Sequence, residues 1–236
     1  MNFETGQKPP HTDMGEQVSE DAEGVLITGQ NGLVSGTRVA AGSGWQSAEK
    51  LNVGDRVLTF DHGMQPVMDI QRETLVMPEL ALPGAQHPVL VPKNTINNLQ
   101  DIWLMPQQGL LVESDTAFDP LGDPFAVVPA RALLGFRGVR TAVPEETLEV
   151  TTLAFAQDEV IYAESGLLMF CPRPRQILSD GKNADAPLYN VLDLHDGRYL
   201  VRCLDEENGF TGFVHSSGDV DQVTQERVPE GHPLRV

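Results

Sequence analysis

The sequence predicts an all-β protein, and two observations support that prediction. From Gly24 onward, short apolar runs alternate with clusters of glycine, proline, aspartate and asparagine about every 8 to 12 residues, a spacing typical of all-β domains. In addition, no segment keeps an amphipathic helical period for three turns. With 236 residues, the chain is long enough for one large domain, or for a smaller domain with extensions.

The strands can be placed in order along the chain. The clearest is 55–60 (DRVLTF), because alternating apolar residues run directly into a turn, Asp61-His62-Gly63. The segment 101–114 (DIWLMPQQGLLVES) predicts two strands joined by a tight polar turn. The other predicted strands are 24–29, 37–41, 66–77, 87–91, 147–155 and 159–166, with a further run at 125–135. Two short helical turns are expected, within 47–51 and within 129–135.

The chain divides into five parts. Residues 1–23 are polar and acidic with a Pro-Pro step, and we expect a disordered tail. Residues 24–172 form the predicted β domain, followed by a Pro-, Gly- and Asp-punctuated linker at 173–187. Because two β-rich runs flank the Asp196-Gly197 step, residues 188–213 are predicted to form a β-hairpin that packs on the domain. Residues 214–236 are predicted to be a flexible tail.

The charge of the chain restricts its partners. The formal net charge is −18, from 34 acidic and 16 basic residues. Such a surface repels phosphate backbones and anionic lipid, so we expect no nucleic-acid or membrane partner. The sequence carries no secretory signal pattern and no apolar run of membrane-spanning length. These observations predict a cytoplasmic protein or one exported by a signal-independent route.

Cysteine and histidine do not form a recognisable metal-binding pattern. Cys171 and Cys203 are read as two buried thiols, although one bridge between them is possible. The six histidines are scattered without zinc-site spacing, so no metal and no cofactor are expected. His62 is predicted to be solvated at a hairpin tip, His87 to be structural and His195 to lie in a turn. Two acidic pairs, Asp193 with Asp196 and Asp219 with Asp221, are read as solvated loops rather than cation sites.

An ordered set of motifs resembles the Hint (Hedgehog/intein) domain in its bacterial branch. The first part of the resemblance is GTRVAAGSGWQSAEKLNVGDRVLTFDHGMQPVMDI, which carries Gly36-Thr37-Arg38, Gly54-Asp55 and Gln65-Pro66-Val67 at the spacing of that branch. HPVLV, DIWLMPQQGLLVE, FAVVPARALLG and EVIYAESG resemble its later strands. Each motif is modest, but their order over roughly residues 30 to 172 is specific.

The resemblance implies a strongly curved β disc built from two pseudo-symmetric halves. The residue pattern agrees with it, because Leu51, Val53 and Val57 are expected to point toward a core, with Gly54-Asp55 supplying a turn before the strand. The predicted C-terminal hairpin would be an addition to this disc.

Hint domains cleave their own backbone, and the resemblance implies which positions would do so. A cysteine or serine attacks the preceding carbonyl, and a histidine protonates the departing amide nitrogen, which is a poor leaving group without a proton. In this chain the nucleophile position is Gly32. The Thr-x-x-His turn has Met105 at its hydroxyl position and Gln108 at its histidine position. Two further histidine positions of the branch align with Thr152 and Asp158.

Three hypotheses follow. The preferred one is a Hint fold that has lost self-cleavage, since glutamine cannot deliver a proton near neutral pH and glycine has no side chain. Its role would be structural or would use the former cleft to bind a protein or peptide. The second is residual self-cleavage or splicing with Ser35 as a non-standard nucleophile. The third is an unrelated all-β adaptor or structural protein. The sequence leaves the oligomeric state open.

Overall fold

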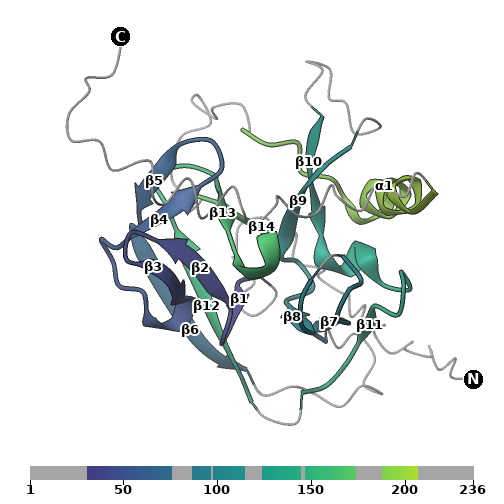
Figure 1. The fold of residues 1–236 in the computed structure, drawn as a ribbon, viewed down its shortest axis with the longest axis horizontal. Coiled ribbons are helices and arrows are strands. Elements are labelled where there is room, and N and C mark those ends of the chain that lie inside the picture. Colours follow the sequence, from purple (N-terminus) through teal and green to yellow (C-terminus); the bar gives the residue numbers. More distant parts are fainter. Residues whose placement is uncertain are drawn as a thin grey trace, which may run out of the picture.

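The computed structural model describes residues 31–75, 87–96, 98–114, 124–144, 147–173 and 188–206. The predicted strand 24–29, both predicted tails and nearly all of the predicted linker lie outside these residues. The described chain is mostly antiparallel β-structure, as the sequence predicts (Figure 1). Within it, no helix has both the length and the apolar character needed to cross a membrane.

In the described part of the chain, fourteen strands form three sheets. The largest sheet has the order β10-β9-β14-β13-β4-β2-β3, with β5 paired to β4; its strands are β2 (Arg38–Ala41), β3 (Gly44–Ser47), β4 (Arg56–Thr59), β5 (Gly63–Pro66), β9 (Gly109–Glu113), β10 (Phe125–Pro129), β13 (Glu159–Tyr162) and β14 (Leu168–Cys171). The second sheet has the order β1-β12-β6, with β1 (Leu33–Val34), β12 (Leu148–Ala154) and β6 (Asp69–Leu75). The third has the order β11-β7-β8, with β11 (Arg140–Thr141), β7 (Val89–Val91) and β8 (Ile102–Leu104).

Among the described residues, three short 3-10 helices connect strands. Two of them, η2 (Ala48–Lys50) and η3 (Ala130–Leu133), lie where the sequence predicts helical turns, and the third is η4 (Glu164–Gly166). Leu51 and Val57 are fully buried, as expected, whereas Val53 is 62% exposed and the prediction for it is wrong. Val53 lies in the turn that precedes β4 rather than on the strand, so the alternation of the strand does not extend to it.

The predicted C-terminal hairpin is also wrong, because residues Leu194–Glu206 form a helix, α1. The Asp196-Gly197 step does not turn the chain. Asp193 precedes the helix and its side-chain oxygen accepts from the Asp196 amide at 2.8 Å, a helix-capping bond. The buried face of α1 has helical spacing and consists of Gly197, Leu200, Val201 and Leu204.

The helix packs on the end of the large sheet, at the opposite side of the molecule from β3 and β5 (Figure 1). Gly197 allows a close approach, since a Cβ there would lie 3.2 Å from atoms of both Ala132 and Val128. The chain entering α1 pairs with β10: Val127 donates to Asn190 at 2.8 Å and accepts from Leu192 at 2.9 Å. The C-terminal segment is therefore an integrated part of the described fold.

Candidate active site and adjoining cavities

The polar turn between β8 and β9 is held in one conformation by backbone hydrogen bonds. The Gln108 amide donates to the Met105 carbonyl at 2.9 Å, which closes a four-residue turn with Pro106 at its second position. From the start of η3, Ala130 donates to the Gln108 carbonyl at 2.8 Å and Arg131 donates to the Pro106 carbonyl at 3.0 Å. The direction of the Gln108 side chain is thus fixed by two neighbouring elements.

The side chain of Gln108 is almost fully buried, at 1% exposure, and uses both ends of its amide. Its nitrogen donates to the Gly109 carbonyl at 2.9 Å and to the Phe170 carbonyl at 3.0 Å. Its oxygen accepts from the Gly32 backbone amide at 3.2 Å. A reversed amide would set its nitrogen against an N–H donor and its oxygen against two carbonyls, so this network requires the orientation seen.

Gly32 directly precedes β1 and has a backbone that excludes a side chain. Its φ is +124°, in the region that favours glycine. A Cβ at this position would lie 2.6 Å from Val150 Cγ1 and 2.9 Å from Thr152 Oγ1, both on β12. The Gly32 amide also donates to Asn31 Oδ1 at 2.9 Å. The position implied for the nucleophile is therefore filled by neighbouring side chains.

The structure brings four of the five implied catalytic positions together. Gly32 contacts Gln108 through a hydrogen bond, and a Cβ on Gly32 would touch Thr152. Met105 is fully buried in an apolar cluster with Val34, Leu148 and Val150. A methionine here fills space and offers no hydroxyl. Asp158 instead accepts from the Arg173 backbone amide at 2.9 Å, just beyond the end of β14.

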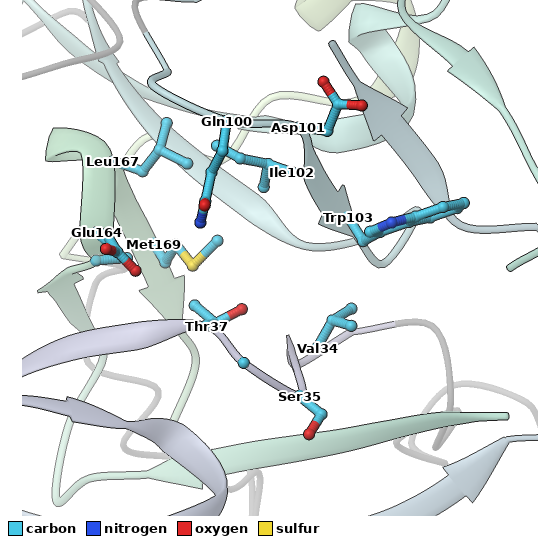
Figure 2. A pocket seen from close by; sticks show the side chains of 12 residues that line it. Val34, Ser35, Thr37, Gln100, Asp101, Ile102, Trp103, Glu164, Leu167 and Met169 are labelled. Carbon is cyan, nitrogen blue, oxygen red and sulfur yellow. The ribbon is translucent and has the colours of Figure 1, made fainter. Parts of the chain in front are cut away.

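Ser35, the alternative nucleophile, lies at the edge of a cavity of about 180 Å³. The side chain is exposed, and the Ser35 amide donates to the Glu149 carbonyl at 2.8 Å. In Figure 2 its hydroxyl points away from Gln100 and Leu167 across the cavity. The titratable side chains among the residues that line this cavity are Asp101 and Glu164, with no histidine or cysteine. This cavity supplies no imidazole for Ser35.

The described histidines lie in three different settings. His62 is not simply solvated: its Nδ1 lies 3.1 Å from a carboxylate oxygen of Glu159, whose side chain is 1% exposed. His87 is 5% exposed, and within the described chain neither ring nitrogen has a hydrogen-bond partner. His195 is exposed in the first turn of α1, not in a hairpin turn.

The acidic residues at the start of α1 are explained by the helix. The ligand atoms of Asp193, His195 and Asp196 lie within 4.8 Å of one another, and all three side chains are exposed. Because Asp193 caps the helix and Asp196 pairs with His195 at 3.1 Å, this group has a structural explanation. The second acidic pair, Asp219 with Asp221, lies outside the described residues.

Both cysteines are free thiols, so the possible bridge between them is absent. Cys171 is buried at the end of β14, whereas Cys203 is partly exposed on α1. Burial, helped by the nearby Glu159 carboxylate, raises the pKa of the Cys171 thiol to about 12. A thiol with such a pKa stays protonated near neutral pH and is a poor nucleophile.

A sequence model described as the Hint domain matches residues 31–168, which is more than half of the chain. The protein belongs to the Hint domain family, and the hypothesis of an unrelated β adaptor is excluded. No curated protein matches the chain.

Solved structures give distant similarities. A splice-inactive variant of the AceL NrdHF class 3 split intein has a TM-score of 0.41 and 14% identity, covering 60% of this chain and 97% of its own. A bacterial intein-like domain from Clostridium thermocellum has a TM-score of 0.39 and 10% identity, covering 59% and 98%. The MchDnaB-1 intein has a TM-score of 0.35 and 10% identity, covering 58% and 98%.

Sequence reasoning missed the contacts that the C-terminal segment makes with the β domain. The Tyr189 hydroxyl donates to Asp61 Oδ2, and burial followed by this hydrogen bond raises the pKa of Tyr189. A separate cavity of about 480 Å³ lies between the segment entering α1 and the turn that holds Gln108. The available signal was the spacing of Leu194, Gly197, Val201 and Leu204 along the segment, which is helical rather than alternating.

Proposed function

We propose that this Hint domain has lost self-cleavage and serves a binding or structural role. The observation that carries the proposal is the hydrogen bond from the Gly32 amide to Gln108 Oε1, at 3.2 Å. In a self-cleaving Hint domain the nitrogen of residue 32 would be the leaving group and would need a proton from residue 108. Here residue 108 presents a carbonyl oxygen to that nitrogen, and its two N–H bonds are used elsewhere.

The position that the family resemblance assigns to the nucleophile also has no reactive side chain. Gly32 has no thiol or hydroxyl, and the contacts of its virtual Cβ with Val150 and Thr152 leave little space for one. Loss of a general acid or of a nucleophile each costs on the order of 10²-fold or more in rate, so losing both at one centre removes practical turnover. The buried Gln108 amide, which binds three backbone groups, supports a structural role for the former catalytic turn.

Intact-mass measurement tests this proposal. The purified full chain is expected to remain at 25.8 kDa after incubation with a thiol or with hydroxylamine, reagents that release thioester or ester intermediates. Two new fragments whose masses place the break between residues 31 and 36 would contradict the proposal. The Ser35→Ala variant tests the alternative, residual self-cleavage by Ser35. If the wild type is cleaved and this variant is not, the cleavage depends on the Ser35 hydroxyl.

A further inference from the structure

A groove with an apolar floor runs between α1 and the chain that follows β10. It encloses about 930 Å³. Its floor includes five apolar side chains that are buried or partly buried: Ala132, Leu134, Phe136, Leu194 and Val201. Such a surface can accept apolar side chains of another segment, because burying them removes their area from water.

The rim of this groove is cationic in a protein that is otherwise strongly acidic. Four arginines line it, namely Arg131, Arg137, Arg198 and Arg202, against two aspartates, Asp193 and Asp205. The whole chain has 16 basic residues and 34 acidic ones. Arg137 is paired with Asp205 at 3.1 Å, which neutralises one arginine. Arg198 and Arg202 are exposed and lie one turn apart on α1. They therefore form a row of positive charge along the groove.

This groove continues toward the former catalytic centre. The cavity of about 480 Å³ is lined by Asn31, Gln107 and Phe170, and it shares Arg131, Asp193 and Leu194 with the groove of about 930 Å³. Arg131 lies at the junction. With the Gln107 amide turned so that its oxygen faces Arg131, that oxygen lies 3.1 and 3.2 Å from the two terminal nitrogens of Arg131. The buried Nε of Arg131 has no partner within the described chain. The two cavities therefore form one extended surface, here called the α1 groove.

We propose that the α1 groove binds an acidic, apolar-containing peptide segment of a partner protein. The inference rests on the binding role proposed above and gives its chemistry: carboxylates of the peptide pair with Arg198, Arg202 and Arg131, and apolar side chains enter the floor. A peptide is favoured over a nucleic acid because the net charge of −18 repels a polyanion at long range, whereas a peptide with a few carboxylates meets mainly the local arginines.

Fluorescence anisotropy with a labelled peptide tests the proposal. The probe is a 12-residue peptide that carries three glutamates and three leucines among serines and glycines, titrated with the full-length protein at low salt. The Arg198→Gln, Arg202→Gln double variant is expected to weaken binding about tenfold, because two charge-assisted contacts at the rim are lost. The matched control is Arg140→Gln, an exposed arginine on β11 outside the groove. It should leave the affinity unchanged.

Three outcomes would overturn the proposal. The first is equal affinity of the wild type and the double variant while circular dichroism shows α1 intact. The second is tighter binding of a 12-nucleotide single-stranded oligonucleotide than of the peptide. The third is binding that occurs only after Glu16, Glu20, Asp21 and Glu23 are replaced by amides, which would assign the groove to a segment of the same chain.

The result can be separated from the question of self-cleavage. Intact mass is measured on the same samples, so cleavage between residues 31 and 36 contradicts the proposed loss of activity whatever the peptide does. A chain that stays intact but does not bind the peptide contradicts only the peptide proposal. A chain that is intact and binds the peptide through Arg198 and Arg202 supports both.

Discussion

Gly32 and Gln108, which are 76 positions apart in the sequence, meet through a hydrogen bond from backbone amide to side-chain oxygen at 3.2 Å. The first residue leads into β1 and the second into β9, so the contact joins the starts of strands from two different sheets. The family resemblance assigns these two positions to the nucleophile and the general acid of a self-cleaving Hint domain. Here the contact joins two groups that neither attack nor protonate.

The space around Gly32 leads to a stability prediction. Gly32→Ala should lower the free energy of unfolding by about 2–4 kcal/mol, because the backbone has φ +124° and the new Cβ would meet Val150 and Thr152 at 2.6 and 2.9 Å. The matched control is Gly36→Ala, where φ is +90° but no atom lies within 4 Å of the Cβ. It should cost roughly 1 kcal/mol from backbone strain alone. Urea unfolding measures both, and equal losses would show that β12 does not crowd residue 32.

The Gln108 network predicts a second loss of stability. Gln108→Leu keeps the volume but leaves the Gly109 and Phe170 carbonyls without the donor they share, so the free energy of unfolding should fall by about 1–3 kcal/mol. Gln71→Leu, on the exposed face of β6, is the control and should change stability by less than about 0.5 kcal/mol. Chemical denaturation measures the free energy of unfolding of both variants. An unchanged free energy for Gln108→Leu would show that this amide does not stabilise the fold.

Much of the β domain could be predicted from sequence because its signals are local. The turn residues around Gly54-Asp55 and the alternation of 55–60 describe β4, and the ordered motifs place Gly32 and Gln108 at positions that the fold brings together. The pairing itself spans 76 positions and cannot be obtained from periodicity. It followed from the family resemblance alone.

The helix α1 was mistaken for a hairpin because two local rules conflict at Asp196-Gly197. An Asp-Gly step favours a tight turn, whereas the spacing of Leu200, Val201 and Leu204 favours a helix. Tertiary packing decides the outcome: Gly197 lets the helix approach Ala132 and Val128 closely, where the Cβ of a larger residue would be crowded by both. The arginine-rimmed groove is formed by this helix, so it could not be predicted from a sequence interpreted as a hairpin.

The buried His87 predicts a gain of stability on substitution. Its imidazole is 5% exposed, and neither nitrogen has a hydrogen-bond partner in the described part of the chain. Burying an unsatisfied polar ring is costly, so His87→Leu should raise the free energy of unfolding by about 1 kcal/mol. His195→Leu, at an exposed position of α1, should have little effect. A lower urea midpoint for His87→Leu would show that the imidazole makes a stabilising contact.

The Cys171 thiol predicts a loss of stability at alkaline pH. Its pKa rises from an ordinary value of 9.0 to about 12, chiefly through burial and then through Glu159. The folded protein therefore holds this proton more tightly than the unfolded chain does. The stabilisation is complete below about pH 9 and is lost as the pH rises toward 12, because the unfolded chain ionises first. At pH 10 the loss should be about 1 kcal/mol.

The Cys171→Ala variant isolates this effect. Tyr189, whose pKa is also raised by burial and by Asp61, destabilises the fold in the same direction above its ordinary pKa of 10.0, so the wild type alone cannot separate the two groups. The variant should be less stable at pH 7, where it loses packing, but its free energy of unfolding should fall less between pH 7 and pH 10. Urea unfolding at both pH values measures the difference. An identical fall in the variant and the wild type would mean that the thiol is as free to ionise in the folded protein as in the unfolded chain.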